Sequence, residues 1–553
     1  MKMTLLQVAT LIAFPLIAAQ QTDCERTALR PMALLVFFDG ARADCLQNAD
    51  CPNLRSLIDG RWADGYRCAW SDAGLNLDEV PTLSYANHST LITGTRPATH
   101  RVRVNGDVKK GVVQPSWLTL LRTARPELRT AAVFSDKNDA KIGPDPSVRQ
   151  FVSSSKDWRE CDSDAAGRMA EMYAGEDAPD AAMFFLQDPD VSGHYRGFYP
   201  CSEDYLAAFA RSDAHLGKVL AAIKSRPTFS KEDWLIAFTT DHGGRGLRHG
   251  PDDGHCHTIP IVLAGRNVQH GIMTGLPRIY DVPVSLLAHF GVTRLPHNVV
   301  GHVLGQSSVP QTLLPREDGR THFCRFDENF PATIDAAATG TPVSLWGYAG
   351  RAATGIAAKQ DAPSPLYGRI EGRDMPAAFR FERSSDVFAG DAPSFSIAFW
   401  IRDDGVVYEK NPILLSNRNF YEERGAGLSL FLRGEVPEGG HGICLVWTGA
   451  DGRPQTLGAF AAERGKWNFL AVVARPDGAI LLYHGRSNGH LNWMAADGTG
   501  ARLNSRLPVY LGQDGTGEYP YGPDIDVDEF SMWSRALSTA EINQVFKAAG
   551  RGR

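Results

Sequence analysis

The chain has 553 residues, which is too many for one compact core and indicates two or three domains. Apolar residues make up 43% of it and charged residues 22%, with a formal net charge of -6 and neither a basic stretch nor an acidic tail. This composition is typical of a globular protein and argues against a nucleic-acid-binding patch.

The first twenty residues have the pattern of a secretory signal peptide. Lys2 precedes an apolar stretch that ends in the small residues Ala18 and Ala19. We therefore predict that residues 1–19 are a signal peptide and that the mature protein is secreted or periplasmic. No later segment contains the ~18 consecutive apolar residues that span a bilayer, so we expect no transmembrane segment.

Nine cysteines fit an oxidising compartment, in which disulfide bonds persist. Their odd number leaves at least one thiol unpaired. We expect disulfide bonds, and Cys45, Cys51 and Cys68 are the cysteines best spaced to pair locally. No two cysteines form a C-x-x-C motif, which argues against a zinc site built on cysteine.

Four short apolar runs end next to aspartates and predict buried parallel strands. A helical pattern over residues 204–224 separates two of them, as expected for an α/β domain with a mostly parallel sheet. Ligands bind beyond the carboxyl ends of such strands, where these acidic residues gather. The four runs cover residues 32–38, 129–135, 181–187 and 234–240.

The pattern changes after about Cys324. Alternating strands with Gly and Asp-Gly turns at short intervals then predict an all-β sandwich. We therefore expect an α/β catalytic domain over residues 20–324 and a β-sandwich domain over residues 325–553.

Two of the aspartates that follow strands stand in motifs suited to chemistry. Asp39 precedes Gly40, which permits a sharp turn, although Asp is also a common helix N-cap. Asp190 and His194 are spaced i, i+4, so in a helix both side chains lie on the same face, where they can coordinate one metal ion. A capped surface helix is the alternative for that segment.

A third motif, "TTDHGGRGLRHG", joins Asp241 and His242 directly after a strand, and the two following glycines allow a tight bend. Carboxylate and imidazole together are a usual zinc donor set. His255 and His257 come next, and the spacing alone does not choose between them as a further ligand.

The segment "SYANHSTLITG" packs hydroxyls, an amide and an imidazole into one stretch, from Ser84 through Asn87 and His88 to Gly94. A surface loop is the simple interpretation of such a cluster. The segment stands between the motif of Asp39 and the motif of Asp190, and this order favours a functional interpretation instead.

Together with "FFDGARADCL", "DPDVSGH" and "TTDHGG", this segment resembles the alkaline phosphatase superfamily, in particular its type I phosphodiesterase/nucleotide pyrophosphatase branch. The resemblance runs in order from Asp39 to about Gly305. It implies an alkaline phosphatase-like fold and a hydrolase with two divalent metal ions, which we expect to be Zn²⁺.

The resemblance also implies the ligands of both metals. Asp39, Asp241, His242 and the Ser84 hydroxyl would hold one ion. The ligands of the other ion would be Asp190, His194 and His257, with His255 as the alternative to His257.

Ser84 would be the nucleophile of a phosphodiesterase, because coordination to a divalent metal ion makes an otherwise inert hydroxyl reactive. A phosphoseryl enzyme would form and be hydrolysed by water. Asn87 would donate its amide to a phosphoryl oxygen. His88, Ser89 and Thr90 are expected to start the helix and to pack.

Two departures bear on the substrate. The phosphodiesterase branch usually has Thr at the position of Ser84, and no arginine clearly matches the one with which alkaline phosphatases prefer monoesters, although Arg42 lies near Asp39. A phosphomonoesterase or a sulfatase-like hydrolase of the same superfamily is therefore the alternative. Sulfatases, however, need Pro and Arg after the nucleophile, and Ser84 is not followed by them.

The C-terminal segments "SFSIAFWIRDD" and "DVDEFSMWSRALSTAEI" resemble laminin-G/concanavalin A-like jelly-roll domains. The resemblance implies binding of carbohydrate and of Ca²⁺, so the expected substrate is a phosphoester linked to a glycan or a lipid. Trp400, Trp467 and Trp533 are expected in the core. A glycan-binding surface protein with an inactive hydrolase domain is the alternative from another functional class.

Overall fold

The computed structural model describes residues 29–549 with internal gaps. The gaps are residues 78, 143–146, 201, 252, 307, 310–317, 325, 327–342, 348–351, 358–365, 374–376, 382, 404, 406–407, 409, 423 and 437. The predicted signal peptide, residues 1–19, lies outside the described residues. None of the described helices is both long and apolar enough to cross a membrane.

The N-terminal domain is built on a nine-stranded sheet in the order β4-β3-β5-β1-β6-β7-β2-β8-β9. From β4 to β6 all neighbours are parallel, whereas β7 pairs antiparallel with both β6 and β2. The four apolar runs form β3, β5, β1 and β6, which confirms the mostly parallel α/β prediction. The strands are β1 (Arg30–Phe38), β2 (Arg67–Leu75), β3 (Thr130–Phe134), β4 (Arg149–Val152), β5 (Ala181–Leu186), β6 (Glu232–Thr239), β7 (Thr258–Gly265), β8 (Gly271–Met273) and β9 (Ser308–Val309).

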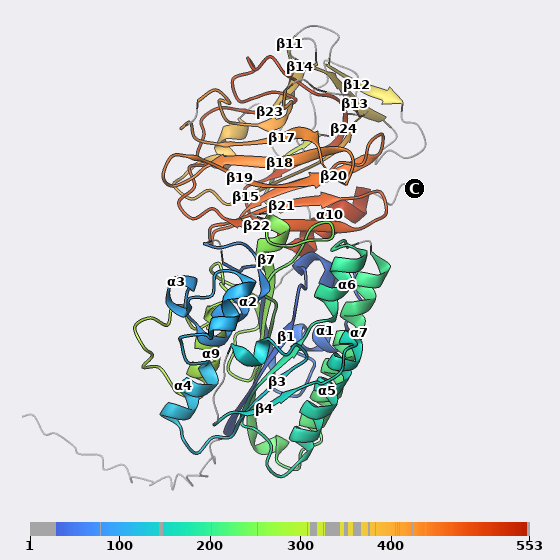
Figure 1. Cartoon of the computed structure of the whole chain (residues 1–553). Helices are drawn as coiled ribbons and strands as arrows, with labels where there is room; N and C mark the ends of the chain where they lie inside the picture. Colours follow the sequence, from blue (N-terminus) through green and yellow to red (C-terminus); the bar gives the residue numbers. More distant parts are fainter. Residues whose placement is uncertain are drawn as a thin grey trace, which may run out of the picture.

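Helices cover both faces of this sheet, with α2, α3, α4 and α9 on one side and α1, α5, α6 and α7 on the other (Figure 1). The helix predicted over residues 204–224 is α7. Strand β1 shows why its sequence is apolar throughout, because alternate residues enter different cores. Leu34 and Val36 pack with one helix layer and Leu35 and Phe37 with the other. The helices are α1 (Pro52–Ile58), α2 (Ser84–Thr93), α3 (Pro97–His100), α4 (Trp117–Ala124), α5 (Trp158–Ala174), α6 (Asp188–Arg196), α7 (Glu203–Lys224), α8 (Gly254–His257) and α9 (Asp281–His289).

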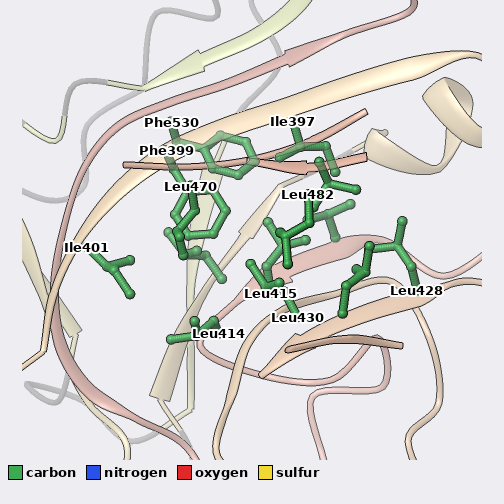
Figure 2. Close-up of a cluster of buried hydrophobic side chains, with 14 of the residues drawn as sticks. Ile397, Phe399, Ile401, Leu414, Leu415, Leu428, Leu430, Leu470, Leu482 and Phe530 are labelled. Carbon is green, nitrogen blue, oxygen red and sulfur yellow. The ribbon is translucent and has the colours of Figure 1, made fainter. Parts of the chain in front are cut away.

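The C-terminal domain is a sandwich of two antiparallel sheets, as predicted. Apolar side chains from both sheets, such as Phe399 and Leu430, meet between them (Figure 2). One sheet contains β10 (Arg320–Cys324), β12 (Ala352–Ala357), β13 (Leu366–Glu371), β15 (Phe395–Asp403), β20 (Trp467–Ala474), β21 (Ala479–Gly485), β22 (Leu491–Asp497) and β24 (Asp524–Trp533). The other contains β11 (Val343–Gly347), β14 (Ala377–Phe381), β16 (Ile413–Ser416), β17 (Leu428–Glu435), β18 (His441–Thr448), β19 (Pro454–Ala461) and β23 (Val509–Leu511), and α10 (Thr539–Ala549) follows both.

Strand β10 precedes the domain boundary that we predict after residue 324, yet it pairs with β24 of the sandwich. The last strand of the N-terminal segment is thus structurally part of the second domain.

The two domains share an apolar interface. Leu75 of β2 packs with Trp400, Trp467 and Trp493 of the sandwich. The Trp493 indole also donates a hydrogen bond of 3.0 Å to the Asp72 carbonyl. Trp400, Trp467 and Trp533 are all buried, which confirms the prediction that they are packing residues rather than exposed sugar platforms.

The structure corrects the prediction that Cys45, Cys51 and Cys68 pair locally, whereas Cys24 and Cys201 lie outside the described residues. No disulfide bond joins the cysteines in the part of the chain that the structure describes. Cys45, Cys51 and Cys68 lie in the apolar core beside α1 and behave as small apolar side chains. Burial raises the pKa of the Cys51 and Cys68 thiols, which makes them poor nucleophiles for disulfide exchange.

Candidate metal centre

Three adjacent parallel strands, β5, β1 and β6, carry the acidic motifs to one edge of the sheet. Asp39 follows β1, Asp190 lies in the first turn of α6 after β5, and Asp241 follows β6. Gly40 has a φ of +68°, and a Cβ there would lie 2.8 Å from the Cα of Asp190. Glycine therefore allows the turn after β1 to pass directly against the start of α6.

One group of potential metal ligands consists of Asp39, Asp241 and His242, whose ligand atoms all lie within 4.8 Å of one another. His242 Nε2 is 3.1 Å from Asp241 Oδ2 and 3.7 Å from Asp39 Oδ1. The Ser84 hydroxyl, in the first turn of α2, lies 3.2 Å from the same nitrogen. The structure thus brings together all four residues that the sequence predicts for the first metal.

A second group consists of Asp190, His194 and His249. His194 Nε2 lies 3.5 Å from Asp190 Oδ1, as the i, i+4 spacing on α6 predicts. His249 Nε2 lies 3.1 Å from His194 Nε2 and 3.7 Å from Asp190 Oδ1. The rings of His249 and His242 stack at 3.7 Å, so the two groups adjoin.

Backbone carbonyls fix the tautomers of the three histidines. Nδ1 of His194, His242 and His249 faces the carbonyl of Leu247, Gly243 and Thr82, respectively, at 2.7–2.9 Å. A carbonyl only accepts hydrogen bonds, so each Nδ1 carries the proton. Each Nε2 therefore presents a lone pair to its group, which is the usual arrangement of a metal-ligating histidine.

These donor sets fit divalent metal ions. Oδ1 of Asp39 and Oδ1 of Asp190 are buried and have no hydrogen-bond partner. The two lone pairs of His194 and His249 face each other at 3.1 Å, which is unfavourable unless a cation lies near them. Carboxylate oxygen and imidazole nitrogen are ligands of Zn²⁺ and of other divalent transition metals.

The carboxylates repel one another in this buried setting. Burial and the charges of Asp241 and Asp190 raise the pKa of Asp39 well above its usual value. Burial likewise raises the pKa of Asp190. Burial also opposes ionisation of Asp241, but His242 and His88 hold its pKa below the ordinary range. Burial lowers the pKa of His242 to about 3, so this imidazole is neutral and can act as a ligand.

His88 has a larger role than the packing role that we predict for it. Its Nε2 lies 3.1 Å from Asp241 Oδ2 and 3.3 Å from Asp39 Oδ2, while its Nδ1 lies 2.6 Å from Asp139 Oδ1. Burial disfavours its charge, yet Asp139 and Asp241 raise its pKa well above the ordinary value. A charged His88 thus holds both carboxylates of the first group in place. Because Asp139 is distant in sequence, no local pattern indicates this arrangement.

The side chain of Asn87 contacts the backbone on the N-terminal side of Ser84. This side chain is fully buried, Nδ2 donates to the Leu83 carbonyl at 3.3 Å, and Oδ1 accepts from the Leu77 amide at 3.3 Å. The bond to Leu83 uses one of the two N–H groups of this amide, so the predicted bond from Asn87 to a phosphoryl oxygen stays a prediction. Ser89 bonds the Tyr85 carbonyl, in line with the structural role predicted for it.

The structure also differs at the last ligand, because neither His257 nor His255 belongs to the two groups. His257 Nδ1 lies 2.8 Å from Asn76 Oδ1, and His255 Nδ1 lies 2.8 Å from Asp253 Oδ1. His249, seven residues after His242, lies in the second group instead. Its signal in the sequence is the glycine-rich return "GGRGLRHG", which is long enough to fold back onto the site.

No group of this kind lies in the described part of the sandwich domain. The Ca²⁺ expected there stays a prediction, without a candidate site among the residues described.

The site thus lies at the carboxyl edge of an α/β sheet, and a sandwich of two antiparallel sheets follows it in the chain. Residues 33–251 match the family model for type I phosphodiesterase/nucleotide pyrophosphatase, and residues 382–543 match that for the concanavalin A-like lectin/glucanases superfamily. The N-terminal domain is thus similar to the type I phosphodiesterase/nucleotide pyrophosphatase family, and the C-terminal domain is similar to the concanavalin A-like superfamily.

Individual relatives are distant. The chain is 25% identical over 259 residues to bis(5'-adenosyl)-triphosphatase ENPP4 of Bos taurus, covering 42% of this chain and 52% of that protein. It is 24% identical over 249 residues to venom phosphodiesterase 2 of Crotalus adamanteus, covering 40% and 28%. It thus spans about half or less of the length of these relatives. The solved structure of murine ectonucleotide pyrophosphatase/phosphodiesterase 5 aligns with 16% identity and a TM-score of 0.37, covering 48% of this chain and 97% of that one.

Proposed function

We propose that the protein is an exported, metal-dependent phosphodiesterase that acts through a phosphoseryl intermediate on Ser84. One observation carries the proposal. Three histidine Nε2 lone pairs and two unpartnered carboxylate oxygens converge on two adjoining groups, and the Ser84 hydroxyl lies 3.2 Å from one of these nitrogens.

The position of Ser84 suits a nucleophile. It occupies the first turn of α2, where the helix dipole and free backbone amides favour negative charge on an oxygen. Its side chain faces the group of Asp39, Asp241 and His242, and the backbone ahead of it is braced by Asn87. Ser84 would attack phosphorus and release the alcohol, and water would then hydrolyse the phosphoseryl bond.

In the loaded enzyme Asp39, Asp241, His242 and Ser84 would hold one Zn²⁺, and Asp190, His194 and His249 the other. Two such ions supply Lewis acidity that activates the nucleophile and stabilises the entering and leaving oxygens of an in-line displacement. The protein's own share is positional. His88 orients the two carboxylates of the first group, and backbone carbonyls fix the histidine tautomers.

The surroundings of Arg42 support a diester substrate. Its guanidinium is buried, forms an ion pair with Asp44 at 2.5 Å, and donates to the carbonyls of Phe198 and Gly244. It is therefore not free to bind the extra negative charge of a monoester. The names of the relatives, which include phosphodiesterases and nucleotide pyrophosphatases, support the same class.

The test is a panel of nitrophenyl phosphate monoesters, diesters and sulfate esters, with metal analysis of the purified full-length protein. We expect about two zinc ions per chain and the highest kcat/KM on diesters. Ser84→Ala should lower kcat by at least about 10³-fold with both metals still bound, because removing a nucleophile costs at least this much. Preferential sulfate hydrolysis, or undiminished turnover by Ser84→Ala, would contradict the proposal.

We further propose that the sandwich domain binds carbohydrate in a cavity of about 330 Å³ between the domains. Asn492, buried in its wall, has an Oδ1 without a hydrogen-bond partner. His484 donates from Nε2 to Asn468 Oδ1, which leaves its Nδ1 lone pair, and burial lowers the pKa of His484 to about 3. Neutral acceptors beside the aromatic ring of Phe460 suit the hydroxyl groups of a sugar.

Isothermal titration of a panel of neutral mono- and disaccharides tests this second part. Asn492→Leu should abolish the binding seen with the wild type, while Asn488→Ala, in the neighbouring β21–β22 turn, should leave it unchanged. No binding by the wild type to any sugar of the panel, or equal binding by Asn492→Leu, would contradict it.

A further inference from the structure

The loop that carries His249 is held from outside the catalytic domain. Arg245, four residues before His249, forms a two-pronged ion pair with Glu438, from Nε to Oε1 at 2.8 Å and from Nη2 to Oε2 at 3.0 Å. Glu438 lies between β17 and β18 of the sandwich. The remaining guanidinium nitrogen, Nη1, donates to Asp253 Oδ2 at 3.0 Å.

Arg245 closes the turn that leads to the metal centre. Its amide donates to the Arg248 carbonyl at 2.8 Å, and the Arg248 amide donates back to the Arg245 carbonyl at 3.1 Å. Within this turn, the Leu247 carbonyl accepts the Nδ1 proton of His194 at 2.9 Å. His249 is the next residue after the turn. The placement of Arg245 therefore bears on two of the three residues of the second group.

The ion pair between Arg245 and Glu438 is shielded from water, with 20% and 17% of the two side chains exposed. A bidentate guanidinium-carboxylate pair fixes both distance and orientation, which a single surface ion pair does not.

We propose that Glu438 is a positioning residue for the metal group of Asp190, His194 and His249, and that it acts through Arg245. The sandwich domain is then part of the scaffold of the metal centre, in addition to any ligand that it binds. This inference rests on the proposed two-metal function.

The chain offers a matched control. Arg278 and Asp497 form an ion pair across the same domain interface, from the segment before α9 to the end of β22. Asp497→Asn removes an interdomain charge as Glu438→Gln does, but from a pair outside the turn of residues 245–248.

The test is calorimetric titration of Zn²⁺ into the metal-stripped full-length wild type, Glu438→Gln and Asp497→Asn, with the Tm of each metal-free protein measured alongside. Removing the partner of a metal ligand weakens metal binding by about 10–100-fold. Because Glu438 acts one residue further out, we expect a loss at the low end, on the order of tenfold, at one of the two binding steps. Asp497→Asn should titrate like the wild type.

A second variant distinguishes positioning from general damage. Arg245→Gln should weaken the same step, and the double variant should be no weaker than the worse single variant, because both changes remove one interaction. Unchanged isotherms for Glu438→Gln, equal weakening of both steps, or equal weakening by Asp497→Asn would overturn the inference. A wild type that binds no Zn²⁺ would instead overturn the proposed function itself.

Discussion

The contact between Gly40 and Asp190 allows a quantitative test of how the metal centre is built. In Gly40→Ala the new Cβ would lie 2.8 Å from both the Cα and the Cβ of Asp190, closer than atoms in van der Waals contact. The backbone at Gly40 also has a φ of +68°, in the left-handed region. The substitution therefore both strains the turn and pushes on the start of α6.

The two effects can be separated with a second glycine. Gly60 has nearly the same φ, +66°, but the nearest atom to a Cβ there is 3.5 Å away, which is ordinary contact. Gly60→Ala thus includes only the cost of the left-handed conformation, about 1–2 kcal/mol. Gly40→Ala adds overpacking, which typically costs about 1–3 kcal/mol. We expect Gly40→Ala to be the less stable variant by this second amount.

Urea denaturation of the metal-free proteins measures this difference in the free energy of unfolding, and zinc titration measures its effect on the site. Because Asp190 is displaced, Gly40→Ala should bind zinc more weakly at one step, and Gly60→Ala should bind it like the wild type. Equal stabilities of the two variants, together with unchanged zinc binding, would refute the close approach of the turn to α6.

Three further predictions follow from single side chains. His249→Ala should remove one of two bound zinc ions on metal analysis, whereas His257→Ala should retain both; the reverse result would restore the ligand predicted from sequence. Burial lowers the pKa of His100 to about 4, so the imidazole is neutral in the folded protein. Its contribution to the free energy of unfolding is full above the unfolded pKa of about 6.5 and is lost as the pH falls from 6.5 through 4. Protonation of His100 in the unfolded chain should lower the free energy of unfolding by roughly 2 kcal/mol between pH 7 and pH 5. Urea denaturation measures this, and a His100→Gln variant with the same pH dependence as the wild type would contradict it. Trp493→Phe should lower the free energy of unfolding by about 1 kcal/mol or more, because it leaves the buried Asp72 carbonyl without its donor, and an unchanged melting curve would count against that bond.

The sequence predicts the fold well because its signals are local. Continuous apolar runs ending at aspartates indicate parallel strands, and since those strands are neighbours, Asp39 and Asp241 meet as expected. The pairing of Asp190 with His194 also follows from one helical turn. These parts need no knowledge of long-range packing.

The remaining site residues depend on how distant segments fold against one another. The choice of His249 over His257 is decided by where the chain goes after the Gly243–Gly244 bend, and His257 is drawn instead to Asn76. The role of His88 depends on Asp139, 51 residues away. The number and spacing of cysteines predict local disulfide bonds incorrectly for a similar reason. Packing in the core, and not proximity in sequence, decides what a buried thiol contacts.

The apolar face between Leu75 and the tryptophans of β15, β20 and β22 has an implication for domain shuffling. A domain that is attached by a flexible linker keeps a polar, hydrated surface. It can be removed or exchanged without destabilising the other domain. Without the sandwich domain, the N-terminal domain would expose this apolar surface around Leu75 to solvent, and exposed apolar surface favours self-association. An exchange of either domain for another would therefore have to keep this apolar interface.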